Sequence, residues 1–152
     1  MSEQTFRDFK LTVEYRWNCD STVIRKSNNK NSGVMYMVPA DYPDMLWPKG
    51  LQFQIKESST GDFILLQEMT LTVNGKQTEP GKSVVVKGIE DPSNLPGEWN
   101  TLVITSENGK ITQELNGKLV NEGSNPSVKE GRILLQYEGF PIDFRKVEIE
   151  IK

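Results

Sequence analysis

The side chains in this sequence that could perform chemistry are carboxylates and amides. The chain contains no histidine and a single cysteine, which excludes Ser-His-Asp and Cys-His catalysis, zinc held by histidine, and a disulfide within the chain. Any catalysis would use carboxylates, Lys, Tyr or a cation bound by oxygen atoms. No EF-hand-like spacing is present, so we assign no metal ligands and predict no cofactor. Cys19 is predicted to be a small buried residue.

Polar side chains alternate with apolar ones along several predicted strands, and this period of two places them on the faces opposite the core. They come from the segments 11–17, 51–56 and 133–138. The polar residues on these faces are Glu14, Arg16, Gln52, Gln54, Gln136 and Glu138. Such a row is most often a solvated outer face. Glutamine amides, however, both donate and accept hydrogen bonds, as sugar hydroxyls do.

A binding groove is the alternative interpretation of this polar face. If the sheet curves, its amides form the floor of a concave site, and loops rich in aromatic residues form the walls. Trp47 lies in one such loop and suits the apolar face of a sugar ring. A Trp47 ring folded back onto the core is an equally good interpretation. We predict that Arg16, Gln54, Gln136 and Glu138 share one sheet face in a single concave site.

Glu14 and Glu138 are the only carboxylates that the alternation places on this polar face. Glycoside hydrolysis uses two carboxyl groups, roughly 5 Å apart for retention and about 6.5–9.5 Å apart for inversion. These two residues are therefore the candidate catalytic pair. Arg16 and Arg145 are candidates for orienting a substrate oxygen, although an Arg beside a Glu equally often forms a surface ion pair.

The elements that must position these residues are strands. Three Asn-Gly pairs, at residues 74–75, 108–109 and 116–117, predict hairpin turns with positive φ at both positions. Alternation and turn residues predict about ten strands, at 11–17, 33–38, 51–56, 64–66, 71–73, 84–86, 99–105, 111–115, 133–137 and 144–151. The segments 39–50 and 90–98 carry prolines and are predicted loops.

No stretch has the spacing of an amphipathic helix. The chain is therefore predicted to be all-β, an antiparallel two-sheet sandwich or jelly roll, in one domain spanning residues 1–152.

Charge and hydropathy exclude two classes of partner. The chain has 18 basic and 21 acidic residues, a net charge of −3, so it lacks the basic field that nucleic-acid binding requires. No apolar run reaches the roughly 20 residues of a membrane span, and the first residues do not resemble a signal peptide. The sequence leaves the compartment and the oligomeric state open.

Six segments in this order resemble the 3-keto-disaccharide hydrolase family, from about residue 6 to the C-terminus. They read FRDFKLTVEYRW, NSGVMY, LQFQI, PGEWNTLVI, ITQELNGKLV and GRILLQYEGFPIDFRKVEI. The resemblance implies a concanavalin A-like jelly roll whose concave sheet handles carbohydrate, commonly in exported bacterial proteins. By position, it implies substrate-binding roles for Asn31, Ser32, Gln54, Gln136 and Arg145, with Glu138 beside them.

The sequence departs from the family pattern at two places. Gln52 stands where the family usually has Glu, and an amide cannot serve as a base, nucleophile or acid. The usual Leu-Phe-Asn-Gly-Lys opening, which forms the first strand, is missing, so another segment fills that edge or the sandwich is smaller. The sequence predicts a carbohydrate-active domain that binds a glycan or glycoside, with Gln52 among its substrate-binding residues and with slow or no turnover. A non-catalytic carbohydrate-binding module and a structural interaction domain are the alternatives.

Overall fold

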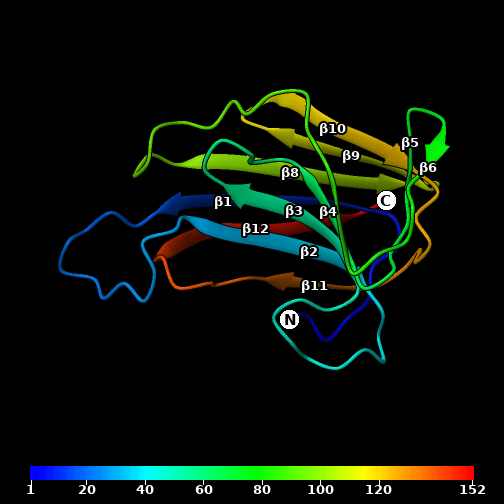
Figure 1. Cartoon of the computed structure of the whole chain (residues 1–152), viewed down its shortest axis with the longest axis horizontal. Helices are drawn as coiled ribbons and strands as arrows, with labels where there is room; N and C mark the ends of the chain where they lie inside the picture. Colours follow the sequence, from blue (N-terminus) through cyan, green and yellow to red (C-terminus); the bar gives the residue numbers. More distant parts are fainter.

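Two antiparallel sheets form the molecule (Figure 1), and the computed structural model describes all 152 residues. One sheet has seven strands in the order β12 (Ile142–Ile151), β1 (Phe9–Trp17), β8 (Asn100–Glu107), β9 (Lys110–Leu115), β10 (Lys118–Ser124), β5 (Thr72–Val73) and β6 (Lys76–Gln77). The other has five, in the order β11 (Arg132–Leu135), β2 (Asn31–Val38), β3 (Gly50–Lys56), β4 (Phe63–Leu66) and β7 (Ser83–Val86). There is no helix. The predicted all-β sandwich is confirmed.

The three Asn-Gly pairs form the hairpin turns β5–β6, β8–β9 and β9–β10, as predicted. Asn74, Asn108 and Asn116 have φ between 50° and 53°, and the glycines that follow them have φ between 77° and 80°. Two strands, β6 and β10, were not predicted. In β10 the register shifts between Leu119 and Asn121, and such a bulge interrupts the alternation from which strands are predicted.

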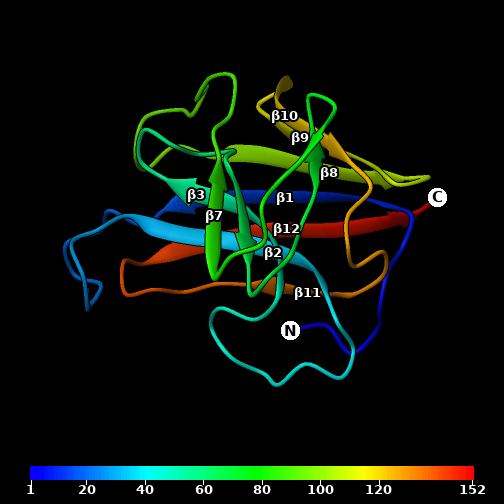
Figure 2. The ribbon, with the colours of Figure 1, turned by 45° about the vertical axis from the view of Figure 1, so that its right-hand side comes forward.

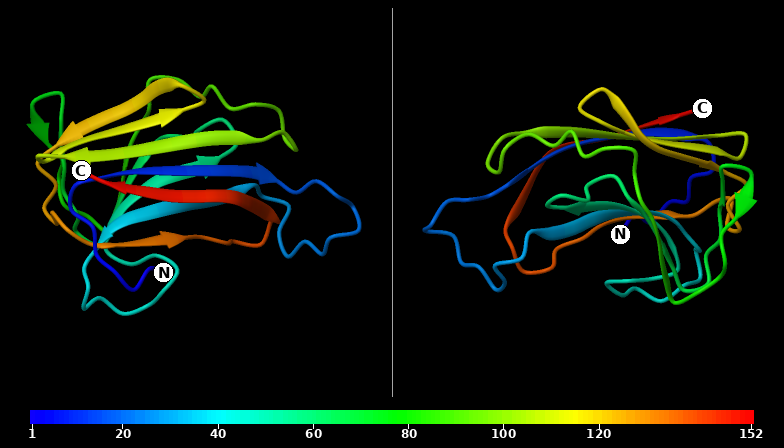
Figure 3. Two further views of the ribbon diagram at one scale, coloured as in Figure 1. Left: turned by 180° about the vertical axis from the view of Figure 1, so that it is seen from behind. Right: turned by 45° about the horizontal axis from the view of Figure 1, so that its top comes forward.

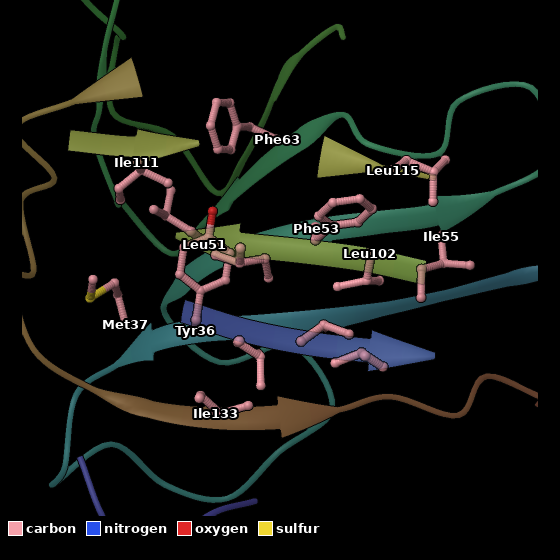
Figure 4. Close-up of a cluster of buried hydrophobic side chains, with 14 of the residues drawn as sticks. Tyr36, Met37, Leu51, Phe53, Ile55, Phe63, Leu102, Ile111, Leu115 and Ile133 are labelled. Carbon is pink, nitrogen blue, oxygen red and sulfur yellow. The ribbon is translucent and has the colours of Figure 1, made fainter. Parts of the chain in front are cut away.

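A core of 22 buried side chains fills the space between the sheets. Figure 4 shows contributions from both layers, such as Phe53 and Ile55 from β3 with Leu102 from β8. A polar bridge crosses this core. The Tyr36 hydroxyl donates to Gln113 Oε1 at 2.7 Å, and Gln113 Nε2 donates to the carbonyl of Gly61 at 2.9 Å. Burial raises the pKa of Tyr36 well above its ordinary value, which keeps this hydroxyl a donor.

A second, smaller apolar cluster lies on the outer face of the five-stranded sheet. Met35, Val38, Ile64 and Leu66 form it, and Tyr42 and Leu134 pack against it. The loop 39–49, predicted as irregular, lies against this face, because Arg132 donates to the carbonyl of Tyr42 at 2.7 Å. Figure 2 shows this loop passing from β2 to β3 beside β11. The outer face is therefore partly covered, and only its remaining part is open to a ligand.

Two edge strands, β11 of the five-stranded sheet and β12 of the seven-stranded sheet, differ in what pairs with their outer edges. At the β11 edge, Phe6 bridges to Gly131 and the Ser2 N–H donates to the carbonyl of Ile133 at 2.8 Å. The first residues of the chain therefore occupy part of that edge. The strand β12, by contrast, pairs with β1 alone (Figure 3).

Cys19 is exposed, so the prediction of a buried cysteine is wrong. Its position explains the exposure. It lies two residues beyond the end of β1, in the polar segment that leads to β2, where no apolar neighbour covers it.

The stability of the sandwich depends on its inward rows, which two matched substitutions test. Ile104 is fully buried in β8 and Ile24 is 82% exposed. We expect Ile104→Ala to lower the free energy of unfolding by about 2–5 kcal/mol, since it removes apolar contacts and leaves a cavity. The same change at Ile24 should have almost no effect. Denaturant unfolding of both variants checks this, and equal losses would contradict the assigned core.

Candidate functional site

Amide side chains gather on the open part of the outer face of the five-stranded sheet. Gly33 of β2 pairs with Gln54 of β3, and on its other side the backbone N–H of Gln136 donates to the Gly33 carbonyl at 3.0 Å. Met35 pairs with Gln52 one step along β2. The strand order β11-β2-β3 thus brings together residues that are more than 80 positions apart in the sequence.

A second row extends the amides toward the end of the strands. Asn31 pairs with Lys56. Leu134 pairs with Met35, and Glu138 follows shortly beyond the end of β11. The Trp47 side chain hydrogen-bonds to the Glu138 carboxyl group, and the positive charge of Lys56 attracts it. We call these residues the amide surface: Asn31, Gly33, Gln52, Gln54, Gln136 and Glu138, bordered by Trp47 and Lys56.

Hydrogen bonds within the amide surface fix its side chains. Gln52 Nε2 donates to Gln54 Oε1 at 2.9 Å and to the carbonyl of Ser32 at 3.4 Å. Gln136 Nε2 donates to the carbonyl of Leu46 at 2.7 Å, which joins the amide to the loop that carries Trp47. Gln52 is 3% exposed and Gln136 is 1% exposed. Both amides are thus held in place before any ligand arrives.

Gly33 makes this arrangement possible. A Cβ atom at this position would stand 2.6 Å from Gln136 Oε1 and would also collide with Gln52 Nε2. Real Cβ atoms do not approach neighbours so closely, because the repulsion rises steeply below van der Waals contact. The absent side chain therefore leaves the space over β2 into which two glutamines extend.

Three oxygen atoms of the amide surface have no hydrogen-bond partner although they are buried. They are Asn31 Oδ1, Gln136 Oε1 and Glu138 Oε2. Burial also raises the pKa of Glu138, while the Trp47 side chain and the charge of Lys56 act in the opposite direction. The surface therefore offers acceptors, in water-poor surroundings where an unmade hydrogen bond is costly.

The predicted single site is wrong for Arg16, which lies on the other sheet together with the candidates Glu14 and Arg145. Arg145 Nε binds Glu14 Oε2 at 2.5 Å, and Arg16 Nε binds Asp143 Oδ2 at 2.9 Å. These residues come from β1 and β12, on the outer face of the seven-stranded sheet. Both guanidinium groups also stack on the Trp99 ring, 4.2 Å and 4.7 Å from its centroid. We call this group the arginine cluster: Glu14, Arg16, Trp99, Asp143 and Arg145.

The two candidate carboxylates therefore cannot flank one bond. Glu14 and Glu138 lie on the outer faces of different sheets, and the packed core separates them. Ser32 is also not on the amide surface. It is fully buried, and its hydroxyl donates to the backbone carbonyl of Gln136 at 2.7 Å. Asn31, Gln52, Gln54, Gln136, Glu138 and Trp47 are the predicted residues that the structure brings together.

Sequence reasoning missed some members of these two groups. Lys56 follows Gln52 and Gln54 on the same face of its strand, so the alternation itself could have included it. Trp99 and Asp143 had no such signal, because their contacts depend on which strands become neighbours. Trp47 is 48% exposed, so its ring does not serve as a cap on the core.

Other parts of the molecule offer different chemistry. A polar cavity of about 870 Å³ lies at the far end of the sandwich, lined by hairpin residues such as Asn74, Asn108 and Lys110. No group of three His, Cys, Asp or Glu side chains is placed to hold a metal ion. The structure also contains no helix that could span a membrane.

Comparison with known families identifies the chain. Residues 1–150 match the model of the 3-keto-alpha-glucoside-1,2-lyase-like domain. The chain belongs to this family. The match covers nearly the whole sequence, including every residue of the amide surface. A comparison with curated proteins finds no match.

Solved structures share the sandwich of this family member. Carbohydrate binding module CBM66 from Bacillus subtilis has a TM-score of 0.65 and 15% identity, over 97% of this chain and 77% of that one. A "putative glycosyl hydrolase" from Parabacteroides distasonis has a TM-score of 0.64 and 22% identity, over 98% and 80%. Sheep galectin-11 has a TM-score of 0.55 and 13% identity, over 97% and 95%. These likenesses show a jelly-roll fold.

The raised pKa of Glu138 predicts a pH effect on stability. The folded state holds the proton more tightly than the unfolded state. The stabilisation from this group is therefore complete below its ordinary pKa of about 4.3, and is lost as the pH rises through the raised value. Glu138→Gln should remove that loss. We expect the free energy of unfolding of the variant, relative to the parent, to increase from about pH 4 to about pH 7.

Denaturant unfolding of both proteins across this pH range provides the measurement. A difference that stays constant with pH would show that burial does not perturb the Glu138 carboxyl.

Proposed function

We propose that this domain binds a glycan or glycoside on the amide surface. The observation that carries the proposal is the set of fixed amides beside Trp47. Gln52 and Gln136 are buried, hydrogen-bonded and directed over Gly33, so they are held in place. A preorganised polar site of this kind loses little conformational entropy when it binds.

Sugar chemistry suits these groups. Each hydroxyl both donates and accepts, and each glutamine amide offers both functions. The Trp47 ring, half exposed at the border, is available to the apolar face of a sugar ring. The family name refers to a 3-keto-alpha-glucoside, and the name of one structural neighbour refers to carbohydrate binding. These names support carbohydrate as the class of ligand.

Turnover of ordinary glycosides is expected to be slow or absent. The amide surface holds one carboxylate, Glu138, whereas ordinary glycoside hydrolysis uses two. Gln52 occupies the position at which the family pattern usually has Glu. An amide there can bind a hydroxyl, but it cannot transfer a proton in catalysis.

An elimination on a 3-keto sugar is the second candidate function. The carbonyl acidifies the neighbouring C–H bond, so one base could remove that proton while the leaving group departs. Glu138 favours this candidate because it is partly buried and its pKa is raised, which strengthens it as a base. The family name, which contains the word lyase, agrees with this candidate.

Two tryptophans provide a matched test of the binding surface. Trp47 borders the amide surface, and Trp99 belongs to the arginine cluster on the other sheet. We expect Trp47→Ala to weaken glycan binding about tenfold or more, a loss of roughly 1.4 kcal/mol. Trp99→Ala should leave it unchanged. Titration calorimetry against a set of neutral oligosaccharides measures both affinities. A loss confined to Trp99→Ala would contradict the proposal, because it would place the binding site on the seven-stranded sheet.

A carboxylate at position 52 tests the expected lack of turnover. We expect the parent protein to release little sugar from ordinary glycosides, and Gln52→Glu to raise the rate, since acid–base catalysis contributes about 10²–10⁴-fold. Adding Glu138→Gln should abolish that gain. Product release from glycosides and from their 3-keto forms is the measurement. Efficient cleavage by the parent that Glu138→Gln abolishes would instead assign Glu138 as the catalytic base.

A further inference from the structure

The unpartnered oxygens of the amide surface restrict the ligand more than its amides do. Asn31 Oδ1, Gln136 Oε1 and Glu138 Oε2 are all acceptors. The Nε2 atoms of Gln52 and Gln136 already donate within the protein, to Gln54, Ser32 and Leu46, whereas these three oxygens accept nothing. A ligand that displaces water from these oxygens must therefore supply hydrogens, and an anionic group cannot.

The three oxygens belong to adjacent positions on two neighbouring strands. The Gln136 backbone bonds to Gly33, and its side-chain oxygen lies over that glycine. Asn31 is two residues from Gly33 on the same face of β2, and Glu138 lies close enough to Lys56, the residue that pairs with Asn31, to feel its charge. Paired residues on neighbouring strands have Cβ atoms about 4.5–5.5 Å apart, so their side chains can meet at a single group. One small group with several hydrogens fits this geometry.

Charge favours a cation. Glu138 is partly buried and takes part in none of the six ion pairs in the molecule. A partly desolvated carboxylate is stabilised by an opposite charge. The Trp47 side chain hydrogen-bonds to the same carboxyl group. A calcium ion fits less well, because it takes six to eight oxygen ligands that usually include several carboxylates.

We propose that the amide surface is specific for amino sugars, and that it receives a protonated primary amine between Asn31, Gln136 and Glu138. An ammonium group carries three hydrogens, one for each unpartnered oxygen, and its charge neutralises Glu138. The inference rests on the proposed binding function and adds the class of sugar. Lys56 lies at the border and opposes the bound charge, so it limits the affinity for such a ligand.

Three trisaccharides with one backbone test the proposal. Chitosan trisaccharide, cellotriose and N,N′,N″-triacetylchitotriose are β-1,4-linked chains that carry an amine, a hydroxyl or an acetamide, respectively, at C2. We expect the amino trisaccharide to bind at least about tenfold more tightly than the other two at a pH that protonates its amine, as charge-assisted hydrogen bonds are the stronger ones. Calorimetry with and without a chelator measures the affinities.

Two substitutions separate a charge effect from a shape effect. Glu138→Gln should abolish the preference for the amine while the weaker binding of cellotriose remains. Lys56→Gln should strengthen binding of the amino trisaccharide severalfold more than it alters binding of cellotriose. Glu14→Gln is the matched control on the other sheet, and we expect no change. Asn31→Ala removes another of the three acceptor oxygens, so it should also reduce the preference for the amine.

The outcomes are distinct. Equal affinities for the amino and hydroxyl trisaccharides, or an equal effect of Glu138→Gln on both, would overturn the amine assignment and leave the binding function intact. Binding that disappears with the chelator and returns with calcium would also overturn it. If neither these trisaccharides nor any neutral oligosaccharide binds, the proposed glycan-binding function itself is wrong.

Discussion

Burial of two facing rows of apolar side chains is the constraint on which the rest of this structure depends. Each strand has a period of two, so a shift of one residue would move its apolar row into water. The inward row of β1 runs from Phe9 to Trp17, and its first four members are at most 1% exposed. The Tyr36–Gln113 hydrogen bond adds a polar contact between the sheets, and a buried donor with one suitable acceptor tolerates no change of register.

The same constraint determines what faces outward. Once Val34 and Tyr36 of β2 are buried, Asn31 and Gly33 must lie on the opposite face. The pairing of β2 with β3 and the bond from Gln136 to Gly33 then assemble the amide surface. No residue of this surface is positioned by a helix. Its precision comes from the rigid sheet beneath it, which suits a site that must hold its amides in one orientation.

Sequence alone predicted the strands and turns well, because Asn-Gly pairs and alternation are local signals. It also predicted that Glu14 and Gln54 face away from the core. Alternation cannot say which of two sheets a strand joins, however, and that choice separates the arginine cluster from the amide surface. Strand order is decided by contacts between distant segments. The bond from Arg145 to Glu14, 131 residues apart, is an example that no local pattern contains.

The hydrogen bonds around Gln52 give a physical reason for an amide at this position. Its Nε2 atom faces two oxygens, Gln54 Oε1 and the carbonyl of Ser32. A carboxylate there would place a third oxygen against these two, with little water to screen the repulsion, since Gln52 is 3% exposed. Gln54 would have to reverse its amide to donate instead. An amide at position 52 thus matches its neighbours, and the Gln136 and Glu138 oxygens remain without partners.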